Sequence, residues 1–100
     1  MLPCSTRLET LEEIRQYVAE TLSRLETLEP HRFHLSQHIL NRSGKPCGMY
    51  FCLHGPRAVR LTAIWETDRN TILFYGSRGE RTHRTRVLEA PAIAAESSAA

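Results

Sequence analysis

The sequence lacks any apolar run long enough to cross a membrane, and it lacks a basic N-terminal region followed by an apolar core. A membrane span needs about 20 consecutive apolar residues, and a secretory signal places a charged segment before its apolar one. We therefore expect a cytoplasmic protein with no membrane partner. The three cysteines are an odd number, so we expect reduced thiols instead of a disulfide framework.

Lysine is nearly absent, because only Lys45 among the 13 basic residues is a lysine. The net charge of +2 hides an asymmetry, with six acidic and three basic residues in 1–30 and five acidic and ten basic residues in 31–100. This imbalance is too mild to indicate nucleic acid by itself. A chain of 100 residues with 41% hydrophobic residues fits one small globular domain.

Residues 6–29 are predicted to form one amphipathic helix. Apolar residues recur there every three or four positions, at Leu8, Leu11, Ile14, Val18, Leu22, Leu25 and Leu28. Thr6 and Glu9 match a capping box at the start, and Pro30 ends the pattern. A coiled coil would need more heptads, so we expect the helix to lie on a sheet.

After Pro30 the apolar period falls to about two, which predicts strands. We expect four, at about 33–42, 48–54, 58–66 and 71–76, joined by short turn-rich segments that favour antiparallel hairpins. Residues 77–88 form a loop, or a fifth strand that ends at Val87 or Leu88. The predicted fold is thus α+β, a helix on a four- or five-stranded antiparallel meander over residues 1–88. The alanine-rich segment 89–100 is expected to be a flexible tail.

The pairing that keeps apolar residues together sets Ile39 against Phe51, Phe51 against Leu61, and Trp65 against Ile72. One face of the sheet then carries the residues expected to pack under the helix. These are Phe33, Leu35, Ile39, Met49, Phe51, Leu53, Val59, Leu61, Ala63, Trp65, Ile72 and Phe74.

The opposite face is mixed in character, and a single helix cannot cover it. It is too apolar to be indifferent to water and too polar to be a second core, which is typical of a surface that meets a partner. We therefore expect a non-enzymatic binding or assembly module, with this face used for homodimerisation or for a protein partner. The expected contact residues are Tyr50, Arg60, Thr62, Ile64, Leu73 and Tyr75.

A second hypothesis is anion or RNA binding through the arginine-rich segments and the sheet tyrosines. Its candidates are Arg57, Arg60, Arg78, Arg81, Arg84 and Arg86. Such residues track phosphates, and tyrosines on a sheet stack bases. However, Glu80 interrupts the run, and charged edge strands that resist aggregation have a similar pattern. The segment "RSGKPCG" lacks the spacing of a phosphate-binding loop and is predicted to be a hairpin turn.

A third hypothesis is a metal or thiol site at His38, Cys52 and His54, which the expected register brings together. Zinc usually takes four ligands from paired short spacings, and no second cysteine pair is present. Cysteine–histidine chemistry at Cys52 also needs an orienting group, and the only acidic residue expected on the same face is Glu66 at its rim. The simpler interpretation is a strand in which Cys52 packs as a small apolar residue. We expect no cofactor and lean against an enzyme.

The segment "GKPCGMYFCLHGPRAVRLTAIWETDRNTILFYGSRGER", residues 44–81, resembles a group of small uncharacterised bacterial proteins. The resemblance implies a compact, self-contained domain. It implies no activity, cofactor or catalytic residue.

Overall fold

The computed structural model describes residues 4–29 and 32–91. One helix and six strands follow one another along this part of the chain. In order they are β1 (Cys4–Arg7), α1 (Leu11–Leu25), β2 (His34–Arg42), β3 (Lys45–His54), the 3₁₀ turn η1 (Pro56–Ala58), β4 (Arg60–Glu66), β5 (Thr71–Tyr75) and β6 (Arg81–Leu88).

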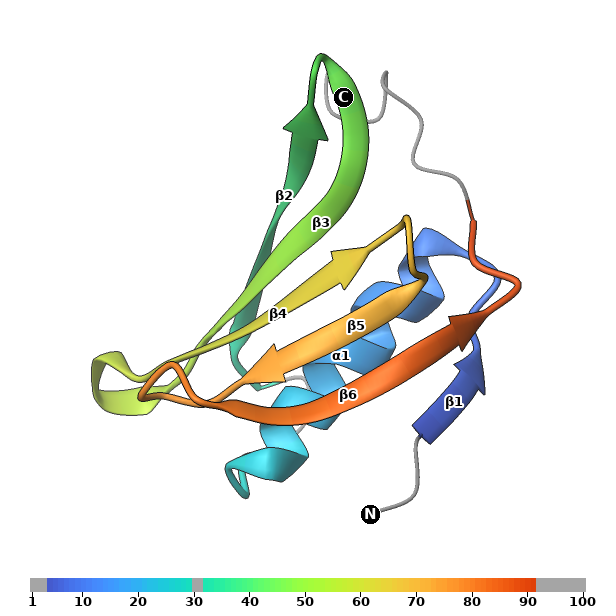
Figure 1. Ribbon diagram of the computed structural model, residues 1–100. Helices are drawn as coiled ribbons and strands as arrows, with labels where there is room; N and C mark the ends of the chain where they lie inside the picture. Colours follow the sequence, from blue (N-terminus) through green and yellow to red (C-terminus); the bar gives the residue numbers. More distant parts are fainter. Residues whose placement is uncertain (1–3, 30–31, 92–100) are drawn as a thin grey trace.

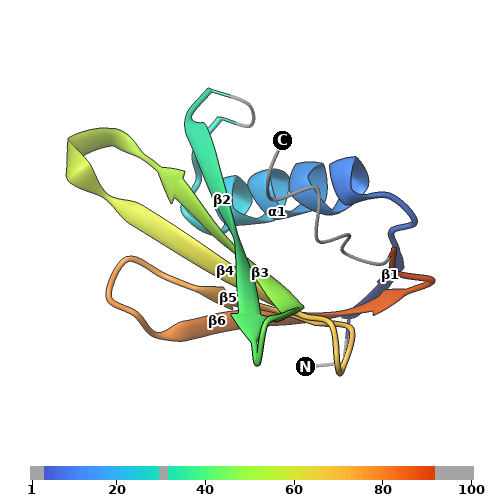
Figure 2. The same ribbon diagram turned by 90° about the horizontal axis from the view of Figure 1, so that it is seen from above.

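The strands form one sheet in the order β1-β6-β5-β4-β3-β2. All neighbours are antiparallel except β1, which pairs in parallel with β6. Helix α1 lies across one face of this sheet, and its chain crosses from the β1 edge to the β2 edge (Figures 1 and 2). The α+β class with an N-terminal helix is thus confirmed. The sheet contains the predicted antiparallel meander, formed by the five consecutive strands β2 to β6. The prediction is wrong in missing β1, whose parallel pairing with β6 makes the described sheet mixed and six-stranded.

The helix starts later than predicted. Residues Cys4–Arg7 pair with Thr85–Leu88 as a strand, and the backbone N–H of Leu8 donates to the carbonyl oxygen of Leu88 at 3.2 Å. The helix therefore begins at Leu11, and Thr10 with Glu13 forms the capping box. The hydroxyl of Thr10 accepts from the N–H of Glu13 at 3.1 Å, and the Glu13 carboxylate accepts from the N–H of Thr10 at 3.1 Å. The predicted capping box at Thr6 and Glu9 is wrong, because Thr6 lies in β1 and the helix begins only at Leu11.

Replacing Thr10 with alanine should lower the free energy of unfolding by about 1 kcal/mol, because the N–H of Glu13 loses its acceptor. Thr10→Ser keeps an acceptor at the same position and is the matched control. Urea unfolding followed by circular dichroism compares the two. Equal stabilities for the alanine and serine variants would contradict the capping assignment.

The helix also ends before Pro30. Thr27 adopts a left-handed backbone with φ of 58°, the N–H of Thr27 donates to the Arg24 carbonyl at 3.1 Å, and the N–H of Leu28 donates to the Ser23 carbonyl at 2.7 Å. These two bonds are the Schellman arrangement that satisfies the last carbonyls of a helix. Leu25, which belongs to the predicted apolar stripe, is 40% exposed at this end of the helix.

The core lies between α1 and the sheet. Ile14, Val18 and Leu22 of the helix are buried, and all twelve sheet residues predicted for this face belong to the same cluster, with Phe33, Ile39 and Val59 only half-buried at its border. Tyr17 reaches over the sheet, where its hydroxyl lies 2.7 Å from that of buried Thr85. The prediction of the helix-facing side is confirmed for these residues.

Two of the three predicted registers are wrong by two residues. Ile39 lies opposite Met49 instead of Phe51, and Phe51 lies opposite Ala63 instead of Leu61. The hairpin loop Ser43–Gly44 is only two residues long, with φ of 53° and 78°, so β3 begins at Lys45. The pairing of Trp65 with Ile72 is confirmed. A shift of two residues preserves the faces because side chains alternate with a period of two.

The predicted C-terminal tail is described only in part. Of the predicted tail 89–100, residues 92–100 lie outside the described residues, whereas Ala90 is half-buried and packs against the core. In the described part of the chain, no helix has the length and apolarity to span a membrane.

Candidate functional site

The face of the sheet turned away from α1 is the candidate site, and we call it the open face. Across its middle, Tyr50, Ile64 and Leu73 lie opposite one another on β3, β4 and β5. The next row is formed by Cys52, Thr62 and Tyr75. These two rows contain five of the six residues predicted to contact a partner.

The open face is half-buried at its centre and polar around it. Tyr50, Thr62, Ile64, Leu73 and Tyr75 are all of intermediate exposure. Neighbours on adjacent strands shield part of each side chain, because residues opposite one another in a sheet have Cβ atoms about 5 Å apart. Figure 2 shows α1 on the other side of the sheet. Within residues 4–29 and 32–91, no second helix covers this face.

Tyr50 is a titratable group at the centre of the open face. Burial raises its pKa, the neighbouring Cys52 raises it further, and the Arg60 guanidinium acts in the opposite direction. The ring of Tyr50 also lies 6.5 Å from that of His38, centroid to centroid, at a tilt of 32°. Arg60, the sixth predicted contact residue, is exposed at the start of β4.

The predicted anion-binding arginines do not form one cluster. Arg57 lies in η1, between β3 and β4, and Arg78 lies in the turn between β5 and β6. The Glu80 carboxylate closes that turn by accepting from the backbone N–H of Arg78 at 3.0 Å. Arg81, Arg84 and Arg86 instead follow one another along β6, opposite Tyr75, Leu73 and Thr71.

A hollow of about 830 Å³ lies at the far end of this β6 row. It is bounded by the β4–β5 turn, by β6 and by β1. Its lining residues are Ser5, Asp68, Arg69, Asn70, Thr71, Arg84, Arg86, Val87, Leu88 and Glu89. The sequence pattern did not indicate Ser5, Arg69 or Asn70, because the hollow exists only once β1 pairs with β6.

The three metal or thiol candidates are not brought together as expected. Ser36, not His38, lies opposite Cys52, and His38 lies opposite Tyr50. His54 instead stacks on His34, with ring centroids 5.6 Å apart. Among the residues that the structure describes, no group of three or more His, Cys, Asp or Glu side chains is placed to hold a metal ion. Cys52 is 5% exposed.

A serine–histidine pair, Ser36 and His54, appears in place of the expected cysteine–histidine pair. The Ser36 hydroxyl lies 3.1 Å from Nε2 of His54, and the carbonyl oxygen of Cys52 lies 3.4 Å from the same hydroxyl. A catalytic serine also needs an orienting acid and oxyanion donors. Within the described chain, His54 has no carboxylate hydrogen-bond partner, and neither Ser36 nor His54 lines the 830 Å³ hollow at the end of β6. We interpret the pair as a cross-strand polar contact.

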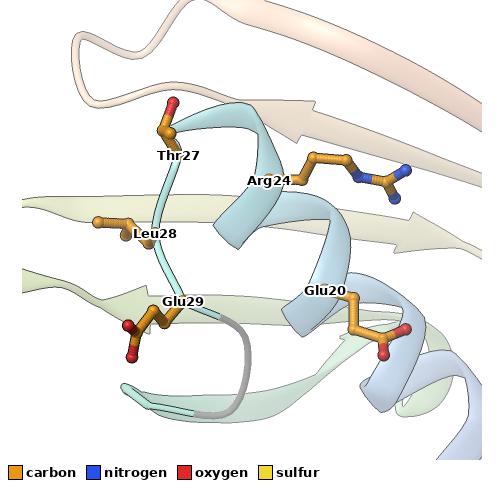
Figure 3. Close-up of a pocket in the computed structure, with 5 residues that line it drawn as sticks. All are labelled: Glu20, Arg24, Thr27, Leu28 and Glu29. Atoms are coloured by element: carbon orange, nitrogen blue, oxygen red, sulfur yellow. The ribbon is translucent and has the colours of Figure 1, made fainter.

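Another hollow, of about 630 Å³, lies at the C-terminal end of α1 (Figure 3). Its five lining residues are Glu20, Arg24, Thr27, Leu28 and Glu29. In Figure 3 the side chains of Glu20 and Arg24 point to one side and those of Leu28 and Glu29 to the other. A ligand site needs polar groups that converge on one point, so this hollow is a weaker candidate than the open face.

Comparisons with known proteins assign no family to this arrangement. The chain matches no protein-family model, no curated protein and no solved structure.

Proposed function

We propose that this chain is a non-enzymatic binding module whose open face receives a partner. One observation carries the proposal. A six-stranded sheet has two faces, and α1 packs on only one of them. The other face presents Tyr50, Ile64, Leu73 and Tyr75 in adjoining rows. Contiguous apolar side chains framed by polar ones are typical of interaction surfaces.

A second copy of the chain is one candidate occupant. The row Tyr50, Ile64 and Leu73 crosses three neighbouring strands and supports this version, because it would form the apolar centre of a two-fold contact. Multi-angle light scattering decides it. A dimer that dissociates on substitution of Ile64 supports homodimerisation. If the chain is a monomer and its NMR lines do not broaden as its concentration rises, homodimerisation is excluded. The partner of the open face is then a different molecule.

Two neighbouring residues on opposite faces of β5 test whether the open face is uncovered. Ile72 is fully buried under α1, and Leu73 is half-buried on the open face. Ile72→Thr should lower the free energy of unfolding by about 2–4 kcal/mol, because it loses core contacts and buries a hydroxyl. Leu73→Thr should cost about 1 kcal/mol or less, since threonine suits a strand.

Urea unfolding of the two variants and the unmodified chain measures this difference. Leu73→Thr acts as the matched change, because it introduces the same residue on the same strand. If both variants lose the same free energy of unfolding, Leu73 is packed against other parts of the chain as tightly as Ile72 is. That result would overturn the proposal.

A further inference from the structure

The β6 arginines form a basic row along one border of the open face. Arg84 and Arg86 lie opposite Leu73 and Thr71, and a register shift between Phe74 and Tyr75 brings Arg81 opposite Tyr75. Alternate residues of a strand are about 7 Å apart, so Arg84 and Arg86 present two guanidinium groups at a regular interval. All three arginines are exposed. The three arginines of β6 therefore form a positive strip beside the aromatic and apolar side chains of β5.

The hollow at the end of this row is positive in spite of its two carboxylates. The Asp68 carboxylate pairs with Arg42 at 3.2 Å, and the Glu89 carboxylate pairs with Arg7 at 3.5 Å. Both partners lie outside the lining of the hollow. In the described part of the chain, Arg69, Arg84 and Arg86 have no carboxylate partner of their own. An anion in the hollow would therefore meet three guanidinium groups whose charge is not neutralised internally.

Backbone hydrogen bonds connect the elements that border the hollow. The N–H of Val87 donates to the carbonyl oxygen of Asn70 at 2.7 Å, which fixes the β4–β5 turn against β6. The N–H of Leu8 donates to the carbonyl oxygen of Leu88 at 3.2 Å, which fixes the end of β1 on the other side. A site that is held before binding loses less conformational freedom when its ligand arrives.

The charges on the two sides of the molecule are opposite. The open face carries Arg60 and the β6 arginines against a single acidic residue, Glu66, in the rows described. Residues 9–29, which contain α1 and flank it, carry six glutamates against two arginines. The electrostatic field of the protein therefore attracts an anionic partner to the open face and repels it from the helix. A second copy of the same face would offer few carboxylates to its arginines.

We infer that the ligand of the open face is single-stranded nucleic acid, an assignment that rests on the proposed function. Phosphates would lie along Arg81, Arg84 and Arg86, with one in the hollow, and unstacked bases would lie on Tyr75 and Tyr50. A basic track beside aromatic side chains is the arrangement by which sheets bind single strands. Bases of a duplex are stacked on each other and are not offered to tyrosines in this way.

Fluorescence anisotropy with labelled oligothymidylate and oligouridylate of about 12 nucleotides, at about 20 mM salt, tests the assignment. The double variant Arg84→Gln/Arg86→Gln should bind at least about tenfold more weakly. Two lost phosphate contacts should also flatten the plot of log affinity against log salt by about 1.4, since each single-strand contact contributes about 0.7. The control Arg24→Gln/Arg32→Gln removes the same charge from the other side of the molecule and should change affinity less than about twofold.

Tyr75 separates nucleic acid from other polyanions. Tyr75→Phe keeps the stacking ring and should bind nearly as the unmodified chain does, whereas Tyr75→Leu should bind about tenfold more weakly. Heparin is the comparison ligand, because it carries charge without bases. If neither oligonucleotide binds at low salt, or if heparin binds equally and Tyr75→Leu has no effect, the nucleic-acid assignment is wrong. The proposed function would survive either result, because it depends on the Leu73 and Ile72 comparison.

Discussion

Replacement of Trp65 with alanine should lower the free energy of unfolding by about 3–5 kcal/mol. Trp65 is completely buried in β4, where it lies opposite Met49 on one side and Ile72 on the other. The side chain fills the space under α1, and its loss would leave a cavity that the surrounding strands cannot close. A domain of this size is stable by only about 5–15 kcal/mol, so this one substitution would remove much of the total.

Trp65→Phe is the control for this prediction. Within the described residues, Nε1 of Trp65 has no hydrogen-bond partner, so phenylalanine loses no polar contact and keeps most of the apolar volume. We expect a loss of about 1–2 kcal/mol. Both variants lack the single tryptophan of the chain, so urea unfolding must be followed by far-ultraviolet circular dichroism. Equal losses for alanine and phenylalanine would contradict the central position of this side chain.

Replacement of Gly48 with alanine should cost about 2–3 kcal/mol, although it adds only one methyl group. A Cβ atom at Gly48 would collide with the backbone carbonyl oxygen of Trp65 on the neighbouring strand. Backbone cannot rotate away as a flexible side chain can, so β3 or β4 must shift. The shift would also disturb the pairing of Gly48 with Glu66.

Gly79→Ala provides the contrast. Gly79 has φ of +81° and open space where its Cβ would lie, so alanine there pays only for the left-handed backbone, about 1 kcal/mol. Urea unfolding of both variants ranks the two effects. If Gly48→Ala lowers the free energy of unfolding less than Gly79→Ala does, the close contact between Gly48 and the Trp65 carbonyl oxygen is contradicted.

The alternation of apolar residues was sufficient to predict which side of the sheet faces the helix. Met49, Phe51 and Leu53 alternate with Tyr50 and Cys52, and this pattern is independent of the exact register. The register itself depends on turn geometry. The observed β2–β3 and β3–β4 pairings differ from the predicted ones by two residues each, because the loop at Ser43–Gly44 and the turn η1 set them.

Strand β1 could not be predicted, because it is short and its pairing is distant. Residues Cys4–Arg7 precede Leu8 and Leu11, which continue the apolar period of the helix, so local pattern alone favours a longer helix. The parallel contact with β6 joins residues about 80 positions apart in the sequence. The hollow beside Arg84 and Arg86 depends on that contact. Consequently the arginines were predictable as candidates, whereas their arrangement was not.

The cysteine and histidine hypothesis depended on the register. A shift of two residues exchanged His38 for Ser36 as the neighbour of Cys52. The predicted partner residues were less sensitive, because Tyr50, Thr62, Ile64, Leu73 and Tyr75 share a face under either pairing. Sequence patterns therefore predict the faces of a sheet more reliably than the particular side chains that meet on them.

The most direct test of the central claim is a two-dimensional ¹H–¹⁵N NMR titration of the whole chain with an oligothymidylate single strand, compared with a concentration series of the chain alone. If the open face is the docking surface, the amide signals that move or broaden will be those of β3 to β6, around Tyr50, Ile64, Leu73 and Arg84. Changes confined to α1 and the outer edge of β2, in either series, would contradict that claim.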